Sequence, residues 1–404
     1  MPDYLAEAAD HLADISALRH ALHRWPETGD DLPRTQAAVL DALAGLDLEV
    51  TTGTDTSSVV AVLRGGAAGP DGRRPVVLLR GDMDGLPVPE ETGMDFASER
   101  DGFMHACGHD LHTSTLVGAA RLLHAHRAEL PGDVVFMFQP GEETLTGANL
   151  MLAEGVLDAA GRAVDRAFGL HAFSGKFPPG TWTTRPGTLM AASDLVTVDI
   201  VGQGGHGSTP SLANDPVPVM AEVILGVQTI IAKKFSPFDP VIVNVGVATA
   251  GQASNVIPER CHLEMSVRTF SPEARERAEG VLTTLIEGIA AAHGCQADIT
   301  YRRGVSPTVN DAAITDVVAR VLGDLVGERF SIMDEPLGGS EDFSEVLARV
   351  PGCFVFYSAV PDGVDADTAP LNHSGQAWFD DAPLAEAMAV YAALAHDSLA
   401  ELAG

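Results

Sequence analysis

Basic residues are scarce in this chain. Its 404 residues include 25 Lys and Arg against 56 Asp and Glu, which gives a formal net charge of −31. A chain of this charge repels phosphate backbones and anionic membrane surfaces, so we expect no nucleic acid and no membrane among its partners. The acidic residues are dispersed rather than gathered in a tail, which indicates that most of them form a solvated surface and only a few act as ligands.

Cysteine is equally scarce. The four cysteines, Cys107, Cys261, Cys295 and Cys353, are widely spaced and form no framework of the kind that staples small secreted domains. The first residues contain neither a basic start nor an apolar stretch of the signal-peptide type, and no later run reaches the roughly 18 apolar residues of a spanning helix. We therefore expect a cytoplasmic protein.

Aromatic residues make up only 5% of the chain, yet hydrophobic residues as a whole make up 46%. This composition excludes a disordered or fibrous protein and leaves enough apolar material for more than one core. At 404 residues the chain exceeds the size that one core usually serves, so we expect two or three domains.

The first part of the chain alternates between helical and strand patterns. Helical spacing of apolar residues predicts helices, and short apolar runs bounded by Gly and Pro predict strands buried on both faces. The predicted helices span 5–24, 34–46, 111–127 and about 148–157, and the predicted strands span 58–63, 75–79, 133–138 and 166–170. Such alternation favours an α/β fold with a mostly parallel sheet covered by helices, in which sites form beyond the carboxyl ends of the strands.

The pattern changes at about residue 188. Predicted elements follow in the order strand, helix, strand, strand, helix, strand, at 195–201, 215–234, 241–248, 261–269, 272–293 and 297–301. This is the order of a ferredoxin-like α+β unit. We therefore expect residues 188–302 to form a second domain inserted into a first domain made of residues 1–187 and 303–404.

A thiol, three imidazoles and a carboxylate occur together in the nine residues 104–112, just before an apolar helix. Cys107 and His109 flank Gly108, so in an extended turn both side chains could face one point, as the ligands of a soft or borderline metal must. The alternative for this stretch is a buried thiol beside surface histidines at a helix start.

Further candidate ligands follow predicted strands. Asp84, Glu142, Glu143 and His171 all fall at strand ends, and His373 lies in a later Asn-His-Ser segment. Cys107, His109, Glu143, His171 and His373 together could hold two metal ions, with the Cys107 thiolate as a bridge. Glu142, next to a ligand, is then the natural general base. The alternative for the glutamate pair is an acidic helix start that the helix dipole favours.

At this point the chain resembles a known family, the amidohydrolase branch of the aminoacylase and carboxypeptidase metallopeptidases, with its hippurate hydrolases, N-acyl-L-amino acid amidohydrolases and indole-acetyl-amino acid hydrolases. The matching segments span nearly the whole chain in order. They are Gly81-Asp82-Met83-Asp84-Gly85-Leu86-Pro87, His105-Ala106-Cys107-Gly108-His109-Asp110, Gln139-Pro140-Gly141-Glu142-Glu143, Gly169-Leu170-His171, Gly204-Gly205-His206-Gly207-Ser208, Asn255-Val256-Ile257-Pro258-Glu259, Gly338-Gly339-Ser340-Glu341-Asp342-Phe343 and Asn372-His373-Ser374.

The resemblance implies a catalytic domain with an inserted lid that also dimerises, so that the protein would be a homodimer, or a tetramer. It implies two divalent ions per subunit, of Zn, Mn, Co or Ni, held by Cys107, His109, Glu143, His171 and His373, with Glu142 as the base. It also implies that His206 stabilises the oxyanion, that Asn255 and Arg268 receive the substrate carboxylate, and that Asp84 orients a ligand.

The function expected from this pattern is metal-dependent hydrolysis of the amide bond of N-acyl amino acids by activated water. Two alternatives stay open: a dipeptidase or carboxypeptidase on the same scaffold, and a catalytically silent metal-binding protein. Among single residues, His206 could be only a turn histidine and Arg268 a solvent-facing strand residue. His105 and His112 could be surface groups or could support the ligands, and Asp110 could be a supporting group or the helix N-cap.

Overall fold

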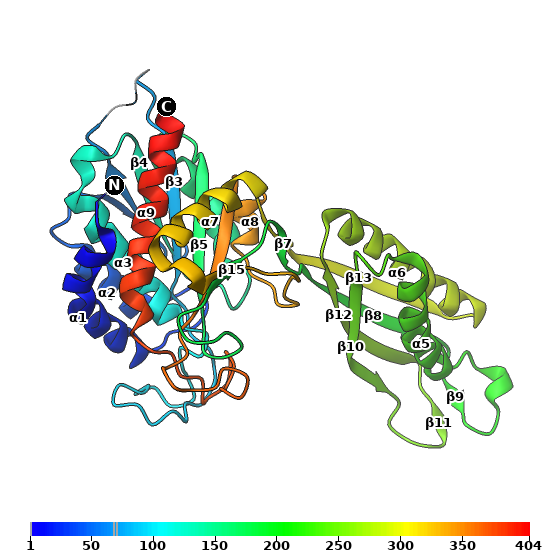
Figure 1. Cartoon of the computed structure of the whole chain (residues 1–404). Helices are drawn as coiled ribbons and strands as arrows, with labels where there is room; N and C mark the ends of the chain where they lie inside the picture. The colour runs from blue at the N-terminus through cyan, green and yellow to red at the C-terminus, as the bar shows by residue number, and fades with distance from the viewer. Residues whose placement is uncertain (1, 68, 70–71) are drawn as a thin grey trace. The chain divides into compact units, whose positions relative to one another are not determined.

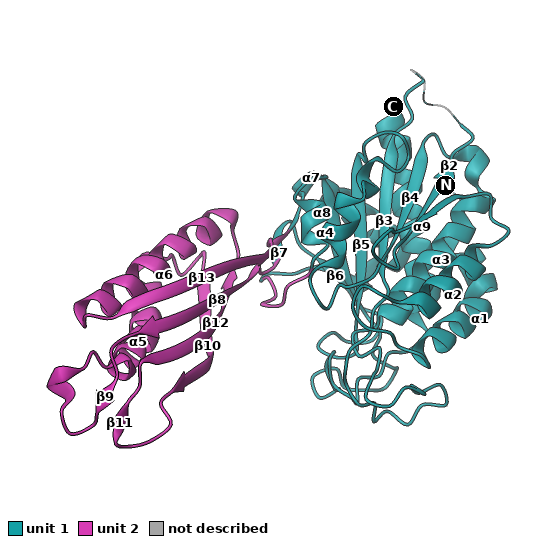
Figure 2. Cartoon of the chain, turned by 180° about the vertical axis from the view of Figure 1, so that it is seen from behind, with its two compact units in different colours: residues 1–189, 309–335, 342–404 teal, residues 190–308, 336–341 magenta. Residues whose placement is uncertain are grey.

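The chain divides into two compact units, shown in separate colours in Figure 2. The computed structural model describes residues 2–67, 69 and 72–404. Unit 1 comprises residues 1–189, 309–335 and 342–404, and unit 2 comprises residues 190–308 and 336–341. The predicted insert of residues 188–302 remains a prediction of the domain boundaries. The corresponding compact unit runs to residue 308, since its last strand, β13 (Gln296–Val305), continues past a bulge, and it also includes the short segment 336–341.

Unit 1 is built on an eight-stranded sheet with the order β1-β2-β4-β3-β5-β16-β6-β15. Its strands are β1 (Glu49–Thr52), β2 (Val59–Arg64), β3 (Val76–Asp82), β4 (Asp133–Gln139), β5 (Arg166–Phe173), β6 (Trp182–Thr184), β15 (Phe330–Ile332) and β16 (Gly352–Ser358). The pairs β4–β3, β3–β5, β5–β16 and β15–β6 are parallel, and the other three pairs are antiparallel. The expected α/β fold with a mostly parallel sheet is confirmed.

Helices cover both faces of this sheet, so its central strands are buried along their whole length. Unit 1 contains α1 (Tyr4–His23), α2 (Pro33–Leu43), α3 (His109–Ala125), α4 (Gly147–Ala153), α7 (Ala312–Val326), α8 (Ser344–Leu347) and α9 (Pro383–Ala403), with short 3-10 turns at Arg127–Glu129, Val156–Asp158 and Gly327–Arg329. The helices α1, α3 and α9 pack against one another in front of the sheet in Figure 1, and α4 and α8 lie in front of it in Figure 2.

The candidate ligands gather where the central strands end. Since β4, β3, β5 and β16 are parallel neighbours, their carboxyl ends meet at one edge of the sheet. Asp84 follows β3, Glu142 and Glu143 follow β4, and His171 lies near the end of β5. The helix α3 begins at this same edge with His109, and its residues from His109 to Ala120 are all buried.

Unit 2 has a four-stranded antiparallel sheet with the order β10-β12-β8-β13. Its elements are β8 (Ser193–Val201), α5 (Pro216–Lys234), β10 (Val241–Ala250), β12 (Arg260–Thr269), α6 (Pro272–Ala292) and β13 (Gln296–Val305). Alternate residues of β8 and β12 are buried, so one face of the sheet packs on α5 and α6. Both the order of elements and the strand order are those of a ferredoxin-like unit.

Shorter elements complete the two units. In unit 2, β9 (Gly205–His206) pairs with β11 (Val256–Ile257), and a 3-10 turn spans Pro210–Leu212. The strands β7 (Gly187–Met190) and β14 (Thr308–Asn310) pair with each other where the chain passes from one unit to the other.

One helix of the described residues, α5, is long and apolar enough to cross a membrane by length and composition alone. We expected no segment to reach that criterion. Three of its valines, Val219, Val223 and Val227, are fully buried in the core of unit 2. Only 22% of its most apolar window is buried, so much of its apolar surface faces outward in the single chain.

The close packing of α3 on α9 gives a stability prediction. A methyl group added at Gly118 would lie 1.9 Å from Sδ of Met388, in a fully buried core, so Gly118→Ala should destabilise the protein by about 1–3 kcal/mol through overpacking. The matched control is Gly323→Ala in α7, where the added methyl group meets no described atom within 4 Å and should stabilise the helix by roughly 0.5–1 kcal/mol. Urea unfolding of the two variants measures both changes, and equal signs would contradict the packing argument.

Candidate metal centre

The turn before α3 presents Cys107 and His109 to the carboxyl edge of the sheet. Gly108, between them, caps α3 in the left-handed conformation, with a φ of 84°, which glycine adopts without the steric cost of a side chain. A Cβ at this position would also lie 2.9 Å from the ring of Phe379. The turn that aims these two side chains therefore depends on a glycine.

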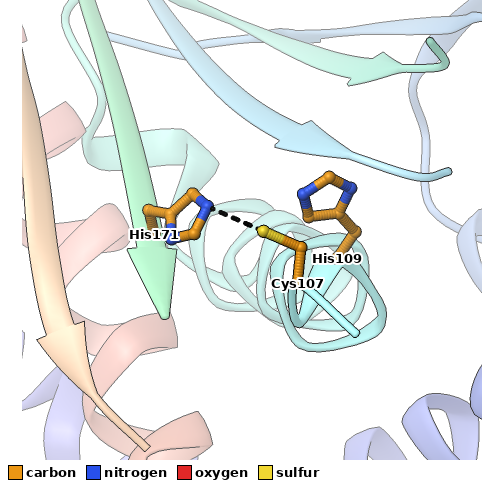
Figure 3. A group of neighbouring side chains, drawn as sticks. All are labelled: Cys107, His109 and His171. Carbon is orange, nitrogen blue, oxygen red and sulfur yellow. Dashed lines mark hydrogen bonds between the residues drawn. The ribbon is translucent and has the colours of Figure 1, made fainter. Parts of the chain in front are cut away.

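The Cys107 sulfur lies at the centre of the predicted ligands. Its Sγ is 3.5 Å from Nε2 of His171 and 3.3 Å from Nε2 of His373. Cys107, His109 and His171 form one group whose ligand atoms all lie within 4.8 Å of one another, and Figure 3 shows the two imidazoles on either side of the sulfur. All three are buried, His171 being 9% exposed.

A second group of ligand atoms shares the same sulfur. Cys107, Glu143 and His373 also lie within 4.8 Å of one another, and Oε1 of Glu143 is 3.4 Å from Nε2 of His373. The side chain of His373 is 55% exposed, so this group is open to solvent where the first is closed. The structure thus brings together all five residues expected as ligands, in two groups that share Cys107.

Buried atoms at this place lack hydrogen-bond partners. Among the described residues, Nε2 of His109 and Oε1 of Glu143 are buried and make no hydrogen bond of normal geometry, although Oε1 of Glu143 has ion-pair contacts with the two imidazoles at 3.4 and 3.9 Å. A buried polar atom without a partner is costly, and a cation would satisfy both atoms. Imidazole, thiolate and carboxylate together suit Zn²⁺ and neighbouring first-row metals, so the residues present fit two ions.

The imidazoles of His171 and His109 are each oriented by a contact at Nδ1, on the side of the ring away from the cluster. Nδ1 of His171 donates to the carbonyl oxygen of Ala172 at 2.9 Å, and Nδ1 of His109 lies 3.3 Å from Oδ1 of Asp84. In the neutral form of each ring, a proton on Nδ1 leaves Nε2 as the nitrogen that faces the cluster, which is how metal-binding histidines are usually held.

Asp84 also holds the two glutamates. Its Oδ1 accepts from the backbone N–H of Glu142 and its Oδ2 accepts from that of Glu143, both at 3.1 Å. Asp84 is buried, and burial raises the pKa of its carboxyl group. One side chain therefore sets the direction of His109 and the backbone from which Glu142 and Glu143 project.

Glu142 is buried beside the cluster, with Oε2 at 3.9 Å from Nε2 of His109. This carboxylate approaches the ligands without belonging to either group that shares Cys107. Its position matches the place expected of a proton-transferring group.

Negative charge dominates the open group. The hydrogen bond with Cys107 and the ion-pair contact with Glu143 raise the pKa of His373 to about 10. The pKa of Glu143 is lowered although burial opposes the shift, because His373 and His109 favour its charged form. The raised pKa of His373 indicates that Cys107 and Glu143 present negative charge, and the lowered pKa of Glu143 keeps this carboxylate ionised as a metal ligand must be.

A second buried network underlies the cluster. Nδ1 of His112 lies 2.6 Å from Oδ1 of Asp82, and Nε2 of His112 accepts from the backbone N–H of Ala172 at 2.8 Å, so this ring is neutral. Burial alone would raise the pKa of Asp82, but the charge of Arg80 and the neighbouring histidines hold it well below its usual range. Asp82 is bound to Arg80 and His112, and therefore supports the cluster from below.

Three residues left open by the sequence are now placed. His105 and His112 are both buried, so they are not surface groups, and burial lowers the pKa of His105 to about 4. The N-cap of α3 is Gly108, which excludes that role for Asp110. Asp110 instead accepts from Nε of Arg19 and pairs with Nδ1 of His23.

Sequence reasoning missed Asn372. Its Nδ2 donates to the carbonyl oxygens of Cys107, at 3.3 Å, and Ala172, at 2.9 Å, and its Oδ1 accepts from the backbone N–H of Ser174. This amide links the segments that carry three of the ligands. Its position directly before His373 was the only indication in the sequence, because a supporting amide does not occur at a fixed spacing from the ligands.

The remaining predicted residues belong to unit 2. His206 on β9 is exposed, and its Nδ1 is 2.7 Å from Oγ of Ser208. Asn255 lies beside it, since its carbonyl oxygen accepts from the backbone N–H of Gly207. Arg268, on β12, is half-buried and donates to Oγ of Ser340 at 2.8 Å. Burial lowers the pKa of this guanidinium, so Arg268 is not the freely solvated strand residue of the alternative.

The role of Asp84 can be tested by metal binding. Asp84→Asn replaces one carboxylate oxygen with an NH₂ group that cannot accept from Glu142 or Glu143, so metal affinity should fall about 10- to 100-fold. Competition with a chromophoric chelator measures the change. Asp101→Asn, at an exposed carboxylate, is the control and should bind as the wild type does. Equal affinity of both variants would show that Asp84 does not orient the ligands.

Comparison with known proteins agrees with this geometry. The model of peptidase family M20/M25/M40 matches residues 78–397. The N-acetylcysteine deacetylase of Bacillus subtilis (strain 168) is 34% identical over 353 residues, 87% of this chain and 90% of that protein. The thermostable carboxypeptidase 1 of Saccharolobus solfataricus is 33% identical over 346 residues, 85% of each chain.

Solved structures show the same fold over the whole chain. A putative aminohydrolase from methicillin-resistant Staphylococcus aureus has a TM-score of 0.91 at 27% identity. The match covers 99% of this chain and 100% of that protein. A Bacillus subtilis protein described as a dinuclear metal-binding peptidase of the M20 family has a TM-score of 0.82 at 31% identity, covering 97% of this chain and 99% of its own. The chain belongs to peptidase family M20/M25/M40 and is a metal-dependent hydrolase of amide bonds.

Proposed function

We propose that this hydrolase acts on N-acyl amino acids, releasing a carboxylic acid and a free amino acid. The observation that carries the proposal is the pair of ligand groups sharing Cys107, with Glu142 buried beside them. Both amide deacetylases and carboxypeptidases occur among the relatives, so a dipeptidase or carboxypeptidase on the same scaffold is the second candidate.

The proposed ligands are Cys107, His109 and His171 for one divalent ion and Cys107, Glu143 and His373 for the other. Zn, Mn, Co and Ni all suit this mixture of sulfur, nitrogen and oxygen donors. When bound, two such ions polarise a carbonyl group and lower the pKa of water. The protein supplies the fixed ligand directions, through the hydrogen bonds of His109 to Asp84 and of His171 to Ala172.

Glu142 is the proposed general base and acid. Its carboxylate takes a proton from the attacking water and returns it to the nitrogen of the departing amino acid, which must leave as an amine. The hydrogen bond from its backbone N–H to Asp84 fixes the position of the backbone from which this side chain projects. Burial of the Glu142 carboxylate keeps bulk water from competing for the proton.

Unit 2 is proposed to act as a lid and a dimerisation domain, with His206 stabilising the oxyanion and Asn255 and Arg268 receiving the substrate carboxylate. A planar guanidinium suits that task because it can pair with both oxygens at once. Arg268 is already partly desolvated, which strengthens its attraction for a carboxylate.

The proposed homodimer has support in unit 2 itself. Its strand β10 is an edge strand with exposed apolar residues Ile242 and Val247, and Leu225 of α5 is 69% exposed. Such edges and apolar surfaces are usually covered by a partner. A monomer in sedimentation analysis would contradict this part of the proposal.

We also propose a cytoplasmic location, in keeping with four cysteines that are all free.

The adjacent glutamates give a matched test of mechanism. Glu142→Gln removes the proton-transferring group but no proposed ligand, so turnover should fall at least about 10²-fold while two ions stay bound. Glu143→Gln should instead lose one of the two ions. Metal content by mass spectrometry and kcat are measured on the same preparations. Near wild-type turnover of fully loaded Glu142→Gln would overturn the mechanism.

The substrate class is tested with a panel. Metal-loaded protein should hydrolyse N-acetyl and N-benzoyl amino acids with a higher kcat/KM than C-terminally blocked peptides, because the proposed contacts of Arg268 need a free carboxylate. Gly-X dipeptides should also be poorer substrates, because their ammonium group loses its hydration on entering the site, whereas an acyl group carries no charge. Preference for dipeptides would support the second candidate. No hydrolysis of any substrate at full metal content would indicate a silent metal-binding protein.

A further inference from the structure

A buried arginine far from the ligands in sequence touches two of the segments that carry them. Arg19, on α1, is fully buried. Its Nε donates to Oδ2 of Asp110 at 3.0 Å, its Nη2 donates to the carbonyl oxygen of Phe379 at 2.8 Å, and its Nη1 donates to Oδ1 of Asp381. One guanidinium therefore joins α1 to the start of α3 and to the segment before α9.

Two of the three partners of Arg19 lie next to proposed ligands. Asp110 directly follows His109 in the first turn of α3. The ring of Phe379 packs against Gly108, between the ligands Cys107 and His109, so closely that a Cβ on that glycine would lie 2.9 Å from it. Arg19 thus fixes the turn of Cys107 and His109 against residues 379–381, which follow His373 in the chain.

The segment from Asn372 to Asp381 is held at both ends. At its first end, the backbone N–H of His373 donates to the carbonyl oxygen of Ala106 at 2.8 Å, and Asn372 binds the backbone of Cys107. At its far end the contacts are those of Phe379 and Asp381 with Arg19. The residues between lie in no helix or strand.

His373 needs such restraint because its backbone is strained. Its φ is 71°, a left-handed conformation that costs a residue with a side chain on the order of 1–3 kcal/mol and persists only where the surroundings impose it. Its side chain is 55% exposed, so packing of the ring does little to hold it. The contacts at both ends of the segment, together with the hydrogen bond from the backbone N–H of Glu91 to the carbonyl oxygen of Gly375, keep its Nε2 near Cys107.

Two histidines of α1 strengthen the same contacts. Nε2 of His20 lies 2.8 Å from Oδ2 of Asp381, and Nδ1 of His23 lies 2.9 Å from Oδ2 of Asp110. Each carboxylate that Arg19 binds is therefore bound a second time by the same helix, Asp381 by the adjacent His20 and Asp110 by His23 of the next turn. A lysine could not replace Arg19 here, because a single ammonium group cannot match three acceptors in one plane.

We propose that Arg19 is a positioning residue of the metal centre, which sets the distance between the Cys107–His109 turn and His373 and thereby the affinity of the ion held by Cys107, Glu143 and His373. The inference rests on the ligands proposed above. Arg19 touches none of them and acts through Asp110, Phe379 and Asp381.

The test is a metal titration of the apoprotein with Co²⁺ in the absence of oxygen, followed by calorimetry and by the sulfur-to-cobalt absorption of Cys107. The variants are Arg19→Met and the milder Asp381→Asn, which leaves the contact between Arg19 and Asp110 in place. Asp397→Asn is the matched control, because Asp397 also binds an arginine, Arg320, and its side chain is 23% exposed against 28% for Asp381.

One of the two binding steps should weaken at least about tenfold in Arg19→Met and Asp381→Asn, while the other step and both steps of the control stay unchanged. The effect of Asp381→Asn should also vanish in a His373→Ala background, because it acts through that ligand. If Arg19→Met fails to fold, Asp381→Asn carries the test alone.

Two results would overturn the proposal: equal affinity of variant and wild type in both steps, or an effect of Asp381→Asn that persists undiminished without His373. A wild-type protein that binds fewer than two ions would instead contradict the dinuclear centre itself. The two failures are therefore distinguishable.

Discussion

The site depends on one constraint, that four polar side chains must point at a single sulfur atom from segments spread over more than half of the chain. Imidazoles lie 3.3 and 3.5 Å from Sγ of Cys107, and both ligand groups include that atom. Gathering such groups in a protein interior is unfavourable unless each is held by further hydrogen bonds. The other residues of unit 1 near the carboxyl edge of the sheet supply these hydrogen bonds.

Each side chain around the sulfur has its own support. Asp84 holds His109 and the backbone of both glutamates, a carbonyl oxygen holds His171, and Asn372 ties the backbone of Cys107 to the segment of His373. Below them, Asp82 is paired with Arg80 and His112. Most of these supports are buried, and each fixes the direction of a side chain or of the backbone, so the positions of the candidate ligands depend on the fold of unit 1.

The sequence was informative where chemistry and pattern coincide. Apolar runs marked the buried strands β3 and β4, and charged or imidazole side chains directly after them predicted a shared edge, which the structure confirms. Motif position also predicted five candidate ligands, and the structure brings the other four close to Cys107. Asp82 received no role from the sequence, and only the fold shows that it pairs with His112 whereas Asp84 pairs with His109.

Other features leave no mark in the sequence. Arg19 sits in an ordinary helical pattern, and its buried partners at positions 110, 379 and 381 become neighbours only through tertiary packing. The assignment of residues 336–341 to unit 2 has no composition signal either. Side-chain pairing over 90 to 360 positions is decided by topology, which local periodicity does not contain.

The strand order has a consequence for how the protein is made. β16, near the end of the chain, lies between β5 and β6 in the finished sheet, and His373 comes later still. Most of unit 2, residues 190–308, is continuous and is synthesised before either. A nascent chain can therefore fold most of the ferredoxin-like unit while the sheet of unit 1 still lacks β16. The set of proposed metal ligands around Cys107 becomes complete only after His373 has been synthesised, when about nine-tenths of the chain has emerged.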